Sequence, residues 1–147
     1  MSSLLYRFIN PPIKVLLRSG LHRLLSDNTM ILEFTGRKSG RVLSTPVSYR
    51  LDDGNIKVFT GTESGWWRNL VARPEVLLTI KGLRSTYHAT VNTDDRATIV
   101  REFTAFLKAV PRDAQFAGVG LDAAGVPLPR DVEIAASKLV YILFQPA

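Results

Sequence analysis

The chain has 147 residues, 46% of them hydrophobic and 22% charged, a composition that is ordinary for a soluble globular protein with one hydrophobic core. It has no cysteine, which excludes disulfides and cysteine-ligated metals and fits a cytoplasmic protein. No apolar run approaches the roughly 20 residues of a membrane-spanning helix, and Arg7, Pro11 and Pro12 interrupt any secretory signal. We therefore expect a single domain over residues 1–147.

The net charge of +6 is concentrated in the first third of the chain. Residues 1–50 hold eight Lys and Arg against two acids, whereas residues 51–147 hold eleven of each. Such a concentration attracts an anionic small molecule, an anionic membrane surface or nucleic acid. We expect no nucleic-acid partner, because the sequence has no helix-turn-helix, zinc-finger or aromatic RNA-binding signature.

Residues 1–27 are predicted to form an amphipathic N-terminal helical segment. Pro11 and Pro12 suit a first helical turn. Apolar residues then recur at helical spacing, and the opposite face is wholly basic, formed by Lys14, Arg18, His22 and Arg23. Two interpretations remain open. The helix packs on the body of the protein, or it lies over a binding site or contacts a membrane surface.

From Met30 onward the hydrophobic period changes to two, and we expect a barrel with helices over residues 28–147. Strands are expected at 30–36, 41–51, 55–61, 75–81, 84–92 and 137–145. A short helix is expected at 64–72 with Ser64 as its cap, and a longer one at 94–110 with Thr93 or Asp94 as its cap. Residues 111–130 are rich in Gly and Pro and are predicted to form a loop with one broken helical turn. The fold class is mainly β with flanking helices (α+β), and a closed or nearly closed barrel of about six antiparallel strands buries one face of each hairpin.

One turn stands out between the first two predicted strands. Its sequence is Thr35-Gly36-Arg37-Lys38-Ser39-Gly40-Arg41. The glycines permit a tight turn with positive φ. The turn gathers three cations, two hydroxyls and backbone N–H groups, which together suit a phosphate or another polyanion. The two histidines, His22 and His88, have no carboxylate cluster near them, so we expect no metal site.

Three further motifs follow this turn: Ser44-Thr45-Pro46-Val47, Thr60-Gly61-Thr62-Glu63-Ser64-Gly65 and Trp66-Trp67-Arg68-Asn69-Leu70. The basic turn and the last of these motifs, at this separation in the chain, form a fairly specific pair. Together with the turn, they resemble the deazaflavin (F-420)-dependent nitroreductase and quinone reductase family of the split β-barrel flavin and deazaflavin oxidoreductases. The resemblance is good over residues 10–92 and only general in the C-terminal third. It implies an FMN-binding-like split β-barrel that binds coenzyme F-420, a deazaflavin with a phospholactyl-polyglutamate tail.

The resemblance also implies the residues that hold the cofactor. Arg37, Lys38, Ser39 and Arg41 would bind the phosphate and tail. Ser44, Thr45, Pro46 and Val47 would line the ring and ribityl chain. Thr60, Gly61, Thr62 and Ser64 would approach from the facing strand, and Trp66 and Asn69 would close the pocket. No catalytic protein residue is implied, because the cofactor itself carries the hydride.

The implied activity is hydride transfer from reduced F-420 to a small electrophilic acceptor, such as a quinone, an enone or a nitro compound. The nitro-reducing members carry tyrosines in the C-terminal substrate region, whereas this sequence has Ala114-Gln115-Phe116-Ala117 and then only Tyr141. The acceptor is therefore open. Two alternatives also remain: an FMN- or FAD-dependent oxidoreductase on the same barrel, and a non-catalytic binder of a flavin or tetrapyrrole. Members of the superfamily are often homodimers. Membrane association through the basic helix remains an alternative to a purely cytoplasmic location.

Overall fold

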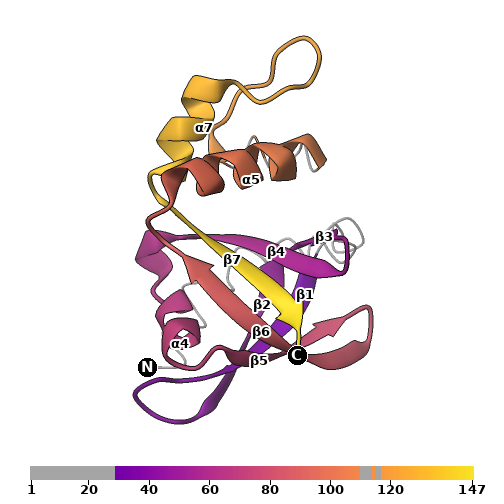
Figure 1. Ribbon diagram of the computed structural model, residues 1–147, viewed down its shortest axis with the longest axis vertical. Helices are drawn as coiled ribbons and strands as arrows, with labels where there is room; N and C mark the ends of the chain where they lie inside the picture. Colours follow the sequence, from indigo (N-terminus) through magenta and orange to yellow (C-terminus); the bar gives the residue numbers. More distant parts are fainter. Residues whose placement is uncertain (1–28, 110–113, 115–116) are drawn as a thin grey trace, which may run out of the picture. The chain divides into compact units, whose positions relative to one another are not determined.

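Seven strands form one sheet in this computed structural model, which describes residues 29–109, 114 and 117–147. The strands are β1 Thr29–Thr35, β2 Val42–Ser48, β3 Arg50–Asp52, β4 Asn55–Gly61, β5 Glu75–Ile80, β6 Leu83–Asn92 and β7 Leu139–Pro146. Their order in the sheet is β2-β1-β5-β6-β7-β4-β3 (Figure 1). β1 pairs antiparallel with β2 and β5, β5 with β6, and β3 with β4. The predicted N-terminal helix, residues 1–27, lies outside the described residues.

The predicted strand at 41–51 is two strands, which is why the sheet has seven strands rather than six. β2 ends at Ser48 and β3 begins at Arg50, and Tyr49 between them is 5% exposed. β2 pairs with β1, whereas β3 pairs with β4 at the other end of the strand order. The period-two pattern continues through Tyr49, so the alternation of apolar residues gave no sign that the hydrogen-bonding partner changes there.

Alternation along β1 and β5 separates a buried face from an open one. Met30, Leu32 and Phe34 are 1%, 0% and 3% exposed, and Val76 and Leu78 on β5 are 3% and 0% exposed. Successive side chains of a strand point to opposite faces. Glu33 and Leu77, which are register partners across β1 and β5, therefore lie on the opposite face from this core.

The described chain divides into two compact units. The first contains residues up to 58, residues 64–91 and residues 142–147, and it includes helix α4, Trp67–Ala72. The second contains residues 59–63 and 92–141, with helices α5 Arg96–Ala109 and α7 Pro129–Ala136 side by side (Figure 1). Its core is the cluster Phe103, Phe106, Leu107, Ala114, Val119 and Val132. The single domain expected from the sequence remains a prediction.

The helices differ from the prediction in three places. In place of the single helix predicted over residues 64–72, the chain has a 3-10 turn, Thr62–Ser64, and then α4. Gly65, with a φ of 74°, separates the two, so Ser64 does not cap α4. α5 is capped one residue later than predicted, since the Asp95 carboxylate accepts hydrogen bonds from the N–H and hydroxyl of Thr98 at 3.2 and 2.8 Å. α7 was missed, although Pro129 stands in its first turn, a position that suits proline.

Two searches of the described residues were negative. None of the helices in that part of the chain is long and apolar enough to cross a membrane. Within the same residues, no group of three or more histidine or acidic side chains could hold a metal ion.

Candidate functional site

The basic turn between β1 and β2 is a closed loop held by its own backbone. The Gly36 N–H donates to the Arg41 carbonyl at 2.8 Å, and the Gly40 N–H donates to the Gly36 carbonyl at 2.9 Å. The Arg41 N–H donates to the Ser39 hydroxyl at 3.2 Å. Gly40 has a φ of 71°, a conformation in which a side chain would be strained. The tight turn predicted from the glycines is present, with positive φ at Gly40 and not at Gly36.

The outer surface of this turn carries cations that have no acidic partner among the described residues. Arg37, Lys38, Ser39 and Arg41 are all exposed. Within the described part of the chain, none of the three cations has an acidic partner, and the backbone N–H groups of Lys38 and Ser39 have no acceptor. Three uncompensated cations beside two free amides have the chemistry that a phosphate group requires. The residues present therefore fit the phosphate of the implied cofactor.

Asn69 on α4 connects this turn to the core. Its Oδ1 accepts hydrogen bonds from the Arg37 N–H at 2.9 Å and from Arg37 Nη1 at 3.1 Å, and its Nδ2 donates to the Trp66 carbonyl at 2.9 Å. Asn69 is 5% exposed and Trp66 is 2% exposed. The Trp66 ring lies 6.0 Å from the ring of Phe34. Both residues predicted to close the pocket are thus buried beneath the turn; the closing role itself remains a prediction.

β2 leads away from the turn and separates the four predicted ring-lining residues onto two faces. Thr45 and Val47 are 2% and 6% exposed, so their side chains belong to the core. Ser44 is exposed and Pro46 is half-buried on the other face. If a ring lies on this strand, Ser44 and Pro46 are the residues whose side chains face it.

The remaining predicted residues lie around the end of β4. Thr60, Gly61 and Thr62 belong to the second unit, where the Thr62 N–H donates to the Lys138 carbonyl at 2.9 Å. Ser64 belongs to the first unit and is half-buried. The approach of these four residues to a cofactor stays a prediction.

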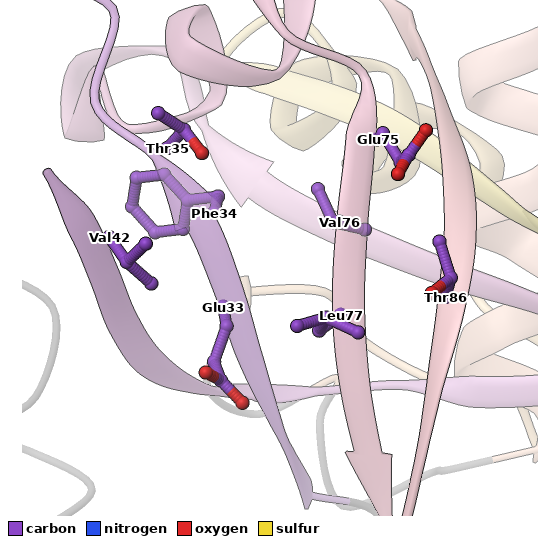
Figure 2. A pocket seen from close by; sticks show the side chains of 8 residues that line it. All are labelled: Glu33, Phe34, Thr35, Val42, Glu75, Val76, Leu77 and Thr86. Atoms are coloured by element: carbon purple, nitrogen blue, oxygen red, sulfur yellow. The ribbon is translucent and has the colours of Figure 1, made fainter. Parts of the chain in front are cut away.

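A pocket at the foot of the turn was not found from the sequence. It has a volume of about 280 Å³ and is lined by Glu33, Phe34, Thr35, Val42, Glu75, Val76, Leu77 and Thr86 (Figure 2). Thr35 and Val42, the register partners that flank the basic turn, form one side of it. A sequence signal for it is Glu33, an acid among the apolar residues of the first predicted strand.

The pocket carries negative charge. The Glu33 carboxylate accepts two hydrogen bonds from Arg84, from Nε and from Nη2, each at 2.9 Å. Glu75 is exposed and has no ion-pair partner among the described residues. The pocket at the base of the cationic turn therefore has one uncompensated carboxylate, that of Glu75, because Arg84 balances the charge of Glu33.

Comparison with known structures identifies the fold. A pyridoxamine 5'-phosphate oxidase-related, FMN-binding protein from Nostoc punctiforme is 17% identical, with 92% of this chain and 81% of that chain covered and a TM-score of 0.56. An F-420H2-dependent reductase is 15% identical, with 79% and 93% covered and a TM-score of 0.52. The heme storage protein HutZ from Vibrio cholerae is 14% identical, with 95% and 90% covered and a TM-score of 0.51. These likenesses confirm the predicted split-barrel fold.

Comparison at the level of sequence identifies the family. No curated protein matches the chain. The family model described as F-420H2-dependent quinone reductase matches residues 18–115, which is more than half of the chain and includes the basic turn, β2 and α4. The chain therefore belongs to the F-420H2-dependent quinone reductase family.

Proposed function

We propose that this protein binds coenzyme F-420 at the turn formed by residues 36–41 and reduces a small electrophilic acceptor, such as a quinone, an enone or a nitro compound. The observation that carries the proposal is the turn itself, where Arg37, Lys38 and Arg41 have no acidic partner in the described part of the chain. Family membership supports F-420 as the anion that these residues receive.

Each part of the site then has a task. The three cations attract the phosphate and the tail carboxylates, and the free N–H groups of Lys38 and Ser39 donate to the phosphate. Ser44 and Pro46 supply a polar and an apolar contact for the ring, a mixture that small-molecule sites use. When bound, reduced F-420 supplies a hydride from C5 of its ring. The protein's own contribution is to bind and orient.

The pocket at the base of the turn differs in charge from the turn itself. Glu33 and Glu75 lie beside Thr35 and Val42 at the base of the turn. Arg84 balances the charge of Glu33, whereas Glu75 has no ion-pair partner among the described residues. One uncompensated carboxylate disfavours a second anion, so we expect this pocket to suit an uncharged or cationic group.

Two alternatives have specific support. The turn would hold the phosphate of FMN or FAD as well as that of F-420, and one relative of the same fold is described as FMN-binding. Another is described as a heme storage protein, which favours a binder without turnover. A homodimer, a cytoplasmic location and membrane contact through residues 1–27 remain predictions.

Titration of the purified protein with F-420 and with FMN tests the proposal. We expect F-420 to bind more tightly than FMN, and the protein supplied with reduced F-420 to transfer a hydride to menadione. Replacing Lys38 and Arg41 together by Ala should weaken F-420 binding by more than about tenfold, because a hydrogen bond to a charged group is worth ~1.5–3 kcal/mol. Equal affinity of this variant and the natural chain would reject the phosphate site.

A matched control removes the same charge elsewhere. Arg101 and Lys108 are exposed on α5, and replacing both by Ala lowers the net charge by the same amount. We expect this control to leave the F-420 dissociation constant within about twofold, since neither residue belongs to the turn that supplies the charged hydrogen bonds. An equal loss in the control would mean that only the overall charge matters. Tight binding of FMN with no affinity for F-420 would establish the first alternative.

A further inference from the structure

Asn69 uses both ends of its buried amide, one bonded to the basic turn and the other to the backbone of Trp66. Oδ1 accepts hydrogen bonds from the backbone N–H and from Nη1 of Arg37, and Nδ2 donates one to the Trp66 carbonyl. We propose that Asn69 is a positioning residue, which holds Arg37 and the turn in the arrangement that receives an anion. This inference rests on the proposed function. It gives Asn69 a role through Arg37 in place of the direct pocket contact that the family resemblance implies.

The chemistry of the amide matters as much as its position. A neutral carbonyl oxygen can hold a guanidinium without cancelling its charge, whereas a carboxylate at the same place would form an ion pair. Arg37 has no acidic partner among the described residues, so its full charge remains available to a ligand. A free arginine side chain has many conformations, and ordering it before binding lowers the entropy lost when the ligand arrives.

The support beneath Asn69 is rigid. Trp66 is 2% exposed, and its ring packs against Phe34, which is 3% exposed on β1. Phe34 lies two residues before Gly36, where the turn begins. A closed path therefore runs from β1 through Trp66 and Asn69 back to Arg37. Both ends of this path belong to the first unit, so the turn and its support are parts of one packed body.

Two substitutions of Asn69 separate position from charge. Asn69→Leu has a similar size and accepts no hydrogen bond, and we expect the dissociation constant for F-420 to rise about fivefold to twentyfold. Asn69→Asp keeps the acceptor but pairs with the guanidinium. We expect a similar rise and a weaker dependence of binding on NaCl concentration, because one cation is cancelled. The control is Val71→Ala, at an exposed position on the same helix, which should change neither quantity.

A double-mutant cycle tests whether Asn69 acts through Arg37. If it does, Asn69→Leu will weaken binding less in an Arg37→Met background than in the natural chain, because the bond from Nη1 is already absent and only the bond from the backbone N–H of residue 37 remains to be lost. Equal effects in both backgrounds would overturn the inference. So would Asn69→Leu binding F-420 normally, or Asn69→Asp retaining the salt dependence of the natural chain.

Failure of the inference is distinguishable from failure of the proposed function. If the natural chain binds no F-420, the proposed function fails, and the same cycle is measured with inorganic pyrophosphate as the anion. Amide hydrogen exchange at residues 37–41 needs no ligand at all. We expect Asn69→Leu to speed exchange at Arg37, whose N–H loses its acceptor. Unchanged protection would overturn the inference whichever ligand binds.

Discussion

Gly36 begins the basic turn, and its replacement by Ala is a sharp test of the turn's internal contacts. An added Cβ would lie 2.8 Å from the Ser39 hydroxyl, 3.5 Å from the Arg41 carbonyl and 3.6 Å from Leu43 Cδ1. The last two are ordinary contacts, and the first is too short. Gly36 is not among the glycines with positive φ, so its backbone conformation admits a side chain. The serine hydroxyl must therefore move.

Two opposing terms set the size of the effect. Moving the Ser39 hydroxyl breaks its hydrogen bond with the Arg41 N–H, which costs ~0.5–1.5 kcal/mol. Replacing Gly by Ala reduces the entropy of the unfolded chain and stabilises by ~0.4–1 kcal/mol. Gly36→Ala alone should thus change the free energy of unfolding by less than about 1 kcal/mol. In a Ser39→Ala background the clash is absent, and the same change should stabilise by about 0.4–1 kcal/mol.

Urea denaturation followed by tryptophan fluorescence measures all four chains, and Trp66, 2% exposed, gives a signal that reports on burial. The expected difference between the two backgrounds is the energy of the lost hydrogen bond, ~0.5–1.5 kcal/mol. A difference below the usual additivity error of about 0.3–0.5 kcal/mol would refute the reasoning. It would mean that the turn accepts a Cβ without moving Ser39.

Two further predictions concern the second unit. The ring centroid of Phe59 lies 5.1, 5.3 and 5.2 Å from those of Phe103, Phe106 and Tyr141. Phe59→Ala should lower the free energy of unfolding by ~2–3 kcal/mol in urea titrations, less than for a fully buried phenylalanine because Phe59 is half-buried. A loss below about 1 kcal/mol would contradict this. The hydrogen bonds from Thr98 hold the pKa of Asp95 below its ordinary value of 3.8. The ionised Asp95 carboxylate therefore stabilises the fold above pH 3.8, and this stabilisation is lost as the pH falls through the folded-state pKa. Asp95→Asn should therefore lower the melting temperature at pH 7 and make no difference at the acid end of a pH series, and an equal shift at every pH would contradict the assignment.

The sequence predicted most of the sheet because one face of each strand is buried. Residues such as Met30, Leu32 and Phe34 alternate with polar or exposed neighbours, and that period is visible without a structure. The break at Tyr49 was not predictable, since Tyr49 keeps the alternation while the pairing partner changes. Helix α7 was missed because its start, Leu128-Pro129, ends a stretch rich in Gly and Pro that is typical of a loop.

The candidate site was predicted in part, for a similar reason. The turn at 36–41 could be found because its glycines and cations are contiguous. The link from Asn69 to Arg37 spans 32 positions, and no local pattern indicates which buried amide meets which arginine. The acidic pocket depends on side chains from β1, β2, β5 and β6, and only the register of these strands places Glu33 and Glu75 on the lining of one pocket. Long-range pairings of this kind are set by tertiary structure.

Pro46 occupies the middle of β2, which stands at one end of the strand order among the described strands. Proline has no N–H to donate, so a foreign strand that tried to extend the sheet along β2 would miss one rung of hydrogen bonds. End strands that lack such protection are where sheets from separate molecules join and aggregate. The residue beside the proposed ring site thus leaves this end of the sheet one donor short for pairing with a strand of another molecule.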